Sequence, residues 1–350
     1  MRLDSTVISG MRAGAGYDAR VIASLSRARQ LQELNILLSN DNTTTRYPAI
    51  VARELGLFER AGLKINYLDS KTAESFVALL AKGEADAVML DAPQTLQAVN
   101  EELPVSAVYE SMQSAPDVLS VVVGGPVNSL EDLKGQTIGL ASERDRVTAQ
   151  IVLATAGIDI DDVRTVVVGD SGRIVAKAIK DKQIVAYAAS INDTTVLAAF
   201  GIEMRDLTPP DIKINPANTF CVWKPRMDEL RPRLEKFFRV WSMAIRSARL
   251  DPATVARMCR TAVPEEWENA EAGQALMEAA ISLNYSVTEA FGDLERDVWQ
   301  AVQRPYRKVG LIDAALDPAT FLDGSLIGAA NDFTDAEVEA ALKEWNAANP

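Results

Sequence analysis

Residues 37–68 read LLSNDNTTTRYPAIVARELGLFERAGLKINYL. The apolar run at 34–38 predicts a short strand, and the small polar residues at 39–45 predict a loop at its carboxyl end. A helix is expected to begin near Pro48, because proline fits a first turn, and to stop at Gly56, which suits the left-handed end of a helix. A polar loop that leads from a strand into a helix N-terminus presents free backbone N–H groups to a ligand.

The same alternation of apolar strands and helices continues along the chain. Further strands are predicted at 85–90, 105–109, 137–140, 163–168 and 184–189, with helices at 72–82, 147–156 and 174–179. This order predicts an α/β protein with mainly parallel sheets. We expect a crossover between two lobes at 118–123, where a β-prone run ends in Gly-Gly-Pro, and a second crossover at 215–222.

These crossovers divide the chain. The expected parts are an N-terminal extension at 1–33, lobe 1 at 34–120 and 216–330, lobe 2 at 121–215, and a C-terminal helix at 331–350. The C-terminal part is predicted to be largely helical, because Leu234, Phe237, Trp241 and Ile245 form one apolar stripe. The pattern from Thr334 to Glu337 is a capping box that opens the last helix.

Polar side chains follow six predicted strands, at 40–45, 91–94, 111–114, 142–146, 170–172 and 190–193. In a two-lobed α/β protein such loops face one crevice. The candidate ligand-binding residues are Asn40, Asp41, Thr43, Tyr47, Asp91, Gln94, Ser111, Gln113, Ser142, Arg144, Asp170, Ser171, Asn192 and Asp193. For any single loop the alternative is helix capping, since Ser, Thr, Asn and Asp are the preferred N-cap residues.

The charges in these loops are mixed. Four are acidic and four are basic, namely Asp41, Asp91, Asp170 and Asp193 against Arg46, Arg144, Arg146 and Arg173. The mixture suits a neutral or zwitterionic molecule, or one with a single anionic group. One arginine with two helix N-termini would orient a carboxylate or sulfonate, whereas Asp41 or Asp91 would receive an amino group. The run at 144–146 is equally open to interpretation as a solvated surface segment.

Aromatic side chains near these loops are candidates for stacking on a planar ligand. They are Tyr47, Tyr109, Phe220 and Trp223, with core packing favoured for Phe220.

The composition excludes several classes of function. The chain has 350 residues, a net charge of −13, no histidine, and two cysteines, Cys221 and Cys259. The negative charge argues against nucleic acid and anionic lipid as partners. Without histidine there is no Ser-His-Asp or Cys-His catalysis, and two cysteines are too few for a disulfide framework or a Cys-type metal site. We expect no metal, no cofactor and, with no run of 18 apolar residues, no transmembrane helix.

Several motifs resemble those of the NMT1/THI5-like, or sulfonate- and nitrate-binding (SsuA-like), group of periplasmic solute-binding proteins. The matching stretches are 47–49 (YPA), 52–63 (ARELGLFERAGL), 83–87 (GEADA), 130–139 (LEDLKGQTIG) and 321–323 (FLD). The resemblance covers roughly 34–330. It implies a two-lobed periplasmic-binding-protein-like (type II) fold with two hinge crossovers and a helical C-terminal part.

The resemblance also implies a function. A monomeric solute-binding component of an ABC importer would hold a small organic molecule, such as a thiamine-precursor-like pyrimidine, in the cleft between the lobes and deliver it to a membrane permease. Alternatives are a sulfonate, nitrate or aromatic-acid binding protein, or an enzyme on the same scaffold that resembles pyrimidine synthases or decarboxylases. The pyrimidine synthases of this family use histidine and a cysteine-rich motif, which this chain lacks. A periplasmic location is implied, although 1–33 holds no apolar run long enough for a secretory signal.

Overall fold

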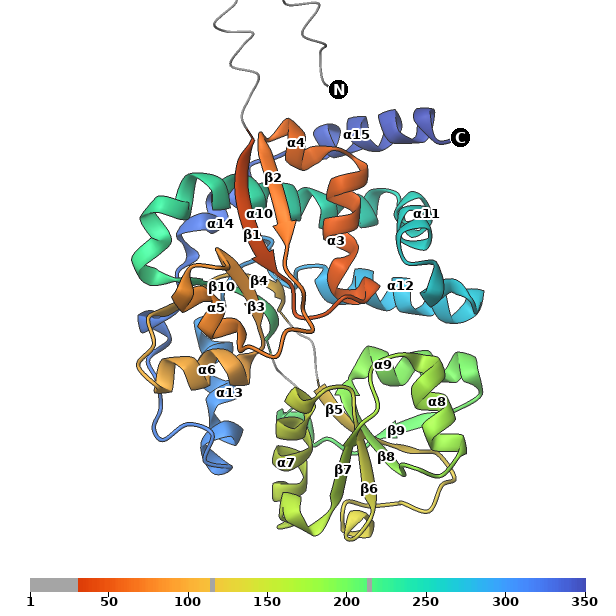
Figure 1. Cartoon of the computed structure of the whole chain (residues 1–350). Coiled ribbons are helices and arrows are strands. Elements are labelled where there is room, and N and C mark those ends of the chain that lie inside the picture. The colour runs from red at the N-terminus through yellow and green to blue at the C-terminus, as the bar shows by residue number, and fades with distance from the viewer. Residues whose placement is uncertain (1–30, 114–116, 213–215) are drawn as a thin grey trace, which may run out of the picture.

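The computed structural model describes residues 31–113, 117–212 and 216–350. Most of the segment expected as an N-terminal extension, together with Ser114, lies outside these residues. The first strand begins at Gln32, so Gln32 and Glu33, which were expected in the extension, are part of the first sheet. Figure 1 shows two α/β bodies, one around each of two five-stranded sheets.

The first sheet has the strand order β2-β1-β3-β10-β4. Its strands β1, β2 and β3 are parallel, and β10 runs antiparallel to both β3 and β4. Their bounds are β1 Gln32–Leu37, β2 Leu63–Tyr67, β3 Ala87–Leu90, β4 Val105–Met112 and β10 Ala217–Trp223.

The second sheet has the order β7-β6-β8-β5-β9. Here β6, β7 and β8 are parallel, and β5 runs antiparallel to β8 and β9. The bounds are β5 Asp117–Val122, β6 Thr137–Leu140, β7 Arg164–Val167, β8 Ala186–Ser190 and β9 Met204–Asp206.

The two sheets therefore share one topology. In each, the reversed strand is the one that the chain enters just after it leaves the other sheet, β5 after β4 and β10 after β9. We refer to the body around the first sheet as lobe 1 and that around the second as lobe 2. The expected crossover at 118–123 corresponds to β5, which is a full member of the second sheet.

Helices cover both faces of the sheets. Around lobe 1 lie α3 Thr43–Glu54, α4 Leu57–Arg60, α5 Phe76–Lys82, α6 Ala92–Asn100, α10 Met227–Leu250, α11 Pro252–Ala262, α12 Ala270–Asn284, α13 Arg296–Lys308, α14 Ile327–Ala330 and α15 Asp335–Ala348. Lobe 2 has α7 Arg146–Thr155, α8 Gly172–Lys180 and α9 Ile191–Thr195. Among the described residues, no helix combines the length and apolar character needed to cross a bilayer.

The long helix α10 anchors the core of lobe 1. Its predicted apolar stripe is confirmed, because all four members are buried. Phe220 of β10 lies edge-on to Trp241, with ring centroids 5.1 Å apart, and Tyr109 of β4 stacks on Phe238 at 4.7 Å. The last helix, α15, opens on the predicted capping box at Thr334 and packs against α10.

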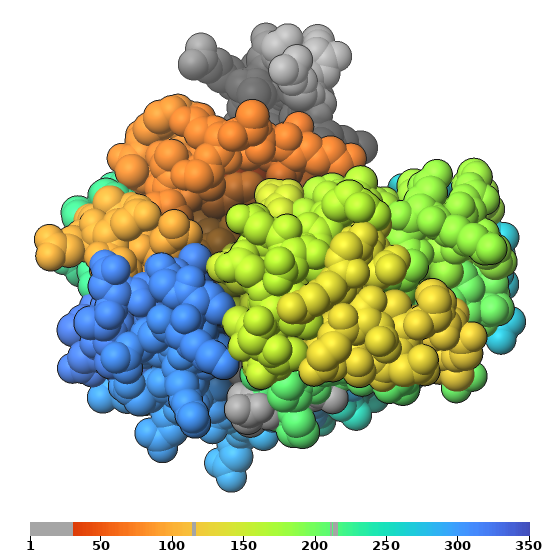
Figure 2. Space-filling view, turned by 90° about the horizontal axis from the view of Figure 1, so that it is seen from below, coloured from red at the N-terminus to blue at the C-terminus, as the bar shows by residue number. Residues whose placement is uncertain are grey.

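The lobes also meet away from their cleft. The α13 segment lies against α7 of lobe 2, where the Lys308 ammonium donates a 3.2 Å hydrogen bond to the Ala154 carbonyl. Figure 2 shows this face, with the blue C-terminal segments next to the yellow-green lobe 2. Ile151 of α7 is buried within a cluster that otherwise consists mainly of lobe 1 side chains.

Candidate functional site

Two adjoining cavities lie between the lobes. Chamber 1, of about 560 Å³, is bounded by the Ser39–Asn42 loop, the start of α8, and the segment before α12. Chamber 2, of about 440 Å³, is bounded by the same loop, the start of α6 and the segment before α7. Both chambers share five residues, which we call the junction: Ser39, Asn40, Asn42, Asp170 and Asp193.

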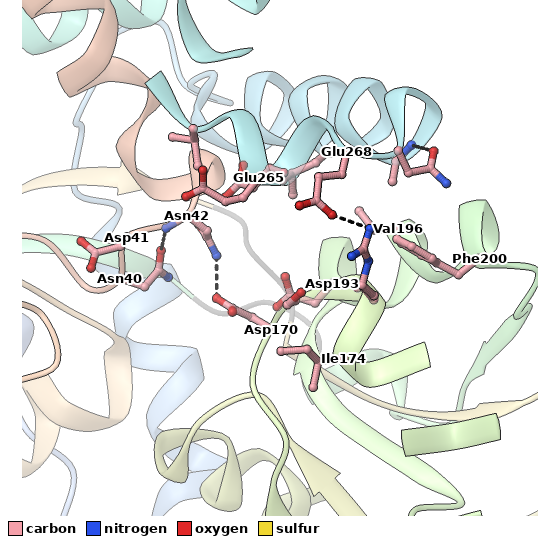
Figure 3. Close-up of a pocket in the computed structure, with 18 of the residues that line it drawn as sticks. Asn40, Asp41, Asn42, Asp170, Ile174, Asp193, Val196, Phe200, Glu265 and Glu268 are labelled. Carbon is pink, nitrogen blue, oxygen red and sulfur yellow. Dashed lines mark hydrogen bonds and ion pairs between the residues drawn. The ribbon is translucent and has the colours of Figure 1, made fainter. Parts of the chain in front are cut away.

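The lobe 1 side of the junction is the loop between β1 and α3. Asn42 caps α3 by accepting a 3.2 Å hydrogen bond from the Thr45 backbone N–H. Its amide nitrogen reaches across the cleft and donates to the Asp170 carboxylate at 2.9 Å. Figure 3 shows this bond, with Asp193 beside Asp170 and with Glu265 and Glu268 on the opposite wall.

A second bridge between the lobes is made by Arg144. This side chain comes from the short 3₁₀ helix η2 (Glu143–Asp145) of lobe 2 and donates to the Ser39 carbonyl oxygen at 3.0 Å. It also pairs with the Asp91 carboxylate at 3.5 Å. Asp91 caps α6 and accepts a 3.1 Å bond from the Asn218 backbone N–H. Both partners of Arg144, the Ser39 carbonyl and the Asp91 carboxylate, belong to lobe 1.

Carboxylates from lobe 2 crowd the junction. Burial, with the nearby charges of Asp170, Asp145 and Asp117, holds the pKa of Asp193 well above the usual range of an aspartate. Burial raises the pKa of Asp145 to about 6, even though Ser142 donates to it from both its backbone N–H and its hydroxyl at 2.7 Å. For Asp145, burial therefore outweighs the hydrogen bonds from Ser142 and the charge of Arg144.

The outer wall of chamber 1 comes from the C-terminal half of the chain. Glu266, in the 3₁₀ helix η7 (Pro264–Trp267), accepts a 3.0 Å bond from the Thr43 backbone N–H. Burial raises the pKa of Glu266 against the effect of this hydrogen bond. Glu268 forms an ion pair across the cleft with Arg173 of α8.

The lining of the two chambers is strongly acidic. Among the described residues it contains ten carboxylates and three cationic side chains. The carboxylates are Asp41, Asp91, Asp117, Glu143, Asp145, Asp170, Asp193, Glu265, Glu266 and Glu268, and the cations are Lys71, Arg144 and Arg173. Two of the cations already have carboxylate partners, Asp91 and Glu268. The loops do carry both charges, but Arg46 and Arg146 do not line a chamber; they pair with the lining residues Asp41 and Glu143.

Nine of the fourteen candidate residues line the chambers. They are Asn40, Asp41, Asp91, Gln94, Ser142, Arg144, Asp170, Ser171 and Asp193. Several also cap helices, since α6, α8 and η2 begin directly after Asp91, Ser171 and Ser142. Capping and cleft lining, which the sequence left as alternatives, occur together because these helix N-termini point at the cleft.

The other five candidates do not line either chamber. Tyr47 is fully buried in the core of lobe 1. Thr43 is also buried, and its backbone N–H donates a hydrogen bond to the Glu266 carboxylate. Ser111 and Gln113 flank Met112, which does line chamber 2; because successive side chains of a strand point to opposite faces, they turn away from it. Asn192 is buried in α9.

Aromatic stacking is also not where we expected it. Tyr47, Tyr109 and Phe220 are all core residues. Trp223 lines a third cavity, beside α5 and α6, which shares Ser39, Gln94, Gln97, Ser142 and Arg144 with chamber 2. Arg46 pairs with Asp41, and Arg146 with Glu143.

Some lining residues were missed by sequence reasoning. Thr44 and Ser190 line chamber 2, and neither hydroxyl has a hydrogen-bond partner among the described residues. Asn218 begins β10 with a positive φ of 47° and donates to Thr45 at 3.1 Å. Glu265, Glu266 and Glu268 are far from any strand end in sequence, so no strand-end argument finds them.

The lining does not offer a nucleophile of the thiol or imidazole kind. Both cysteines are buried in the hydrophobic cores, and burial raises the pKa of each thiol to about 12. They belong to different core clusters, Cys221 to one and Cys259 to the other. Within the described part of the chain, no group of three Asp, Glu, Cys or His side chains is arranged to hold a metal ion.

The chain is similar to a known protein family and to several solved structures. The profile of a family described as NMT1/THI5 like matches residues 43–255. A riboflavin-binding protein, RibY of Chloroflexus aurantiacus, is 22% identical over 300 residues, which cover 82% of this chain and 84% of RibY.

Two further relatives have different names. A 4-amino-5-hydroxymethyl-2-methylpyrimidine phosphate synthase of Schizosaccharomyces pombe is 22% identical over 152 residues, 43% of each chain. This chain thus spans less than half the length of that synthase. The alkanesulfonate-binding protein SsuA of Xanthomonas axonopodis, solved with MOPS bound, superposes with a TM-score of 0.60 at 14% identity, covering 84% of this chain and 98% of SsuA. At that identity the likeness shows the periplasmic-binding-protein fold.

Proposed function

Because the chain belongs to the NMT1/THI5-like family, we propose that it is a solute-binding protein whose interlobe cleft holds a small organic molecule carrying a positively charged nitrogen group. An aminopyrimidine of the thiamine-precursor kind is one member of this class. The chambers are closed in by both lobes, which is the usual setting for a solute site in a hinged α/β protein.

The observation that carries the proposal is the charge of the lining. Ten carboxylates line the two chambers against three cations, and four of these carboxylates, Asp41, Asp91, Glu143 and Glu268, pair with arginines. Buried like charges disfavour their own ionisation, so a bound cation lowers the free energy of the cleft, whereas an anion raises it. The lining therefore favours a cation over a sulfonate.

Solute binding is coupled to closure by the bridges between the lobes. Asn42 reaches Asp170, and Arg144 reaches Ser39, in each case across the cleft. A cation that contacts Asp193 of lobe 2 and Asn40 of lobe 1 adds further contacts that exist only when the lobes are closed. Such differential contacts shift the equilibrium toward the closed state.

We further propose that the protein works as a monomer outside the cytoplasmic membrane, in the periplasm, and hands its solute to an ABC-importer permease. The names of the SsuA relatives support this setting: the superposed Escherichia coli protein is titled a periplasmic aliphatic sulphonate binding protein.

Two alternatives are weaker. Binding of a sulfonate, nitrate or aromatic acid requires a net positive lining, whereas the carboxylates of the chambers outnumber Lys71, Arg144 and Arg173. An enzyme related to the pyrimidine synthases has support from the relatives' names. However, the chain has no histidine, and neither of its buried cysteines lines a chamber.

A thermal-shift panel tests the proposal. The panel contains aminopyrimidines, aliphatic amines, sulfonates, nitrate and aromatic acids. A solute present at 100 times its dissociation constant adds about 2.7 kcal/mol of stability. We expect only nitrogen cations to raise the melting temperature, and Asp193→Asn to reduce the shift while the exposed control Glu339→Gln retains it. Shifts confined to anions would contradict the proposal, and chemical conversion of a panel member would favour the enzyme.

A further inference from the structure

The N-terminus of α3 lies at the cleft, and a protein carboxylate occupies it. The helix spans Thr43–Glu54 and has no acidic residue in its first turn. The Thr43 backbone N–H instead donates to the two carboxylate oxygens of Glu266, at 3.0 and 3.4 Å. Glu266 lies 223 residues further along the chain and lines chamber 1. A side chain from the C-terminal half therefore supplies the negative charge that a helix N-terminus attracts.

The segment that carries Glu266 is held in place by its neighbours. The 3₁₀ helix η7 packs against both α11 and α12. Its last residue, Trp267, lies against Gly273 of α12, where an added Cβ would come within 2.6 Å of the indole ring. Glycine at this position leaves the space that the ring fills, because any side chain there would displace it. The packing of Trp267 thus positions the adjacent Glu266 carboxylate at the start of α3.

A carboxylate in this position takes the place of a bound anion. Helix N-termini bind carboxylate, sulfate and phosphate through their free backbone N–H groups. Here the Thr43 N–H already donates to Glu266, and the Thr45 N–H donates to the Asn42 side chain. An anionic group that enters chamber 1 therefore meets a protein carboxylate where it would otherwise find a hydrogen-bond donor.

We propose that Glu266 is a specificity-determining residue of the cleft. Its carboxylate fills the anion position at the N-terminus of α3 and excludes the anionic group of a solute from that position. This inference rests on the proposed function, since it assigns a role within the same solute site. It concerns one helix end and the group that occupies it, so it does not depend on the total charge of the lining.

The neighbouring Glu265 provides a matched control. It belongs to the same 3₁₀ helix and lines the same chamber, on the wall that Figure 3 shows. Among the residues that the structure describes, no hydrogen bond links Glu265 to α3, whereas Glu266 accepts one from Thr43. Removal of either glutamate changes the charge of chamber 1 equally, but only the loss of Glu266 vacates the helix N-terminus.

Isothermal titration calorimetry of sulfate and methanesulfonate into the full chain tests this inference. We expect Glu266→Ala to bind at least one of these anions about tenfold or more tightly than the parent, because the vacated Thr43 N–H gains a charge-assisted hydrogen bond. Glu265→Ala should behave as the parent does. Glu266→Gln keeps an oxygen acceptor for the Thr43 N–H, so the position stays filled and the gain should be smaller than in Glu266→Ala.

The Thr43 amide resonance provides a second measurement that needs no variant to fold. In the parent protein at neutral pH, sulfate should not shift this resonance in a ¹⁵N-resolved NMR titration, because the N–H is held by Glu266. In Glu266→Ala the same titration should shift it in a saturable way.

The outcomes separate this inference from the proposed function. If Glu266→Ala gains no affinity for either anion, or if Glu265→Ala or Glu266→Gln gains as much, Glu266 does not determine the specificity, and the proposal of a cation-binding cleft is unaffected. Saturable binding of either anion by the parent, with a shift of the Thr43 resonance, overturns both.

Discussion

Arg144 of lobe 2 donates a 3.0 Å hydrogen bond to the carbonyl oxygen of Ser39 in lobe 1. The same guanidinium pairs with Asp91, so the basic side chain of chamber 2 joins the two lobes. Contacts between protein groups alone therefore contribute to closure.

We predict that Arg144→Gln shifts the solute-free protein toward the open state. The lost hydrogen bond and ion pair are partly exposed, so we expect the closed-to-open ratio to fall by about tenfold. Small-angle X-ray scattering should report a larger radius of gyration without solute.

The neighbouring Arg146 provides a matched control. It pairs with Glu143 of its own lobe, three residues away, and lines neither chamber. Arg146→Gln should leave the scattering curve unchanged; equal expansion in both variants would show that Arg144 does not hold the lobes together.

Gln113 is predicted to be structural and not a ligand contact. Its side-chain oxygen accepts from the N–H of Val287 at 2.8 Å, and its amide donates to Thr288 and to the Asp293 carbonyl. Gln113→Ala leaves these buried groups unpaired, so we expect a loss of roughly 1–3 kcal/mol in the free energy of unfolding. Denaturant unfolding measures this loss, and solute affinity of the folded variant should be preserved. If the variant is as stable as the parent but has lost solute affinity, Gln113 contacts the solute and the prediction is wrong.

The raised pKa of Asp145 predicts a pH effect on stability. A carboxyl whose pKa is about 6 in the folded state and about 3.8 when unfolded binds more protons in the folded state between these values. Its contribution to stability is therefore greatest below pH 3.8 and is lost as the pH rises toward 6. Asp193 and Glu266 shift in the same direction.

Asp145→Asn should consequently weaken the decline in melting temperature between pH 4.5 and pH 7. The charged groups that act on Asp145, Arg144 and Asp91, are unchanged in the variant. An identical pH profile for the variant and the parent would contradict the burial of this carboxyl. The same titration predicts that cation binding weakens as the pH falls through about 6.

Both thiols should be inert in the native state. Burial raises the pKa of Cys221 and of Cys259 to about 12, and the two side chains lie in separate cores. Ellman's reagent should label neither thiol until denaturant is added and should then label both. Rapid labelling of the native protein would contradict the burial of the thiols. A disulfide between Cys221 and Cys259 would contradict their placement in separate cores.

The sequence predicted those residues of the chamber lining whose position follows from local order alone. Asn40, Asp91, Ser142 and Asp170 each follow a strand, and the carboxyl ends of parallel strands must meet at one edge of a sheet. The alternation of strands and helices was sufficient to place them.

Other residues depend on packing that no local pattern carries. Ser111 and Gln113 lie at a strand end as well, but the pleat turns them away from chamber 2 while Met112 faces it. Glu266 reaches the cleft because η7 packs against the start of α3, where Thr43 donates to it. The acidic character of the cleft emerged only when these C-terminal carboxylates joined those of the strand ends.

The charge of the solute is tested most directly by titrating n-butylamine and butane-1-sulfonate into the protein in a calorimeter. Both have a four-carbon chain, and they carry opposite charges. We predict saturable binding of n-butylamine, strongly weakened by Asp193→Asn, and no heat of binding from the sulfonate. Binding of the sulfonate, or n-butylamine binding that ignores Asp193→Asn, would contradict a cation site between the lobes.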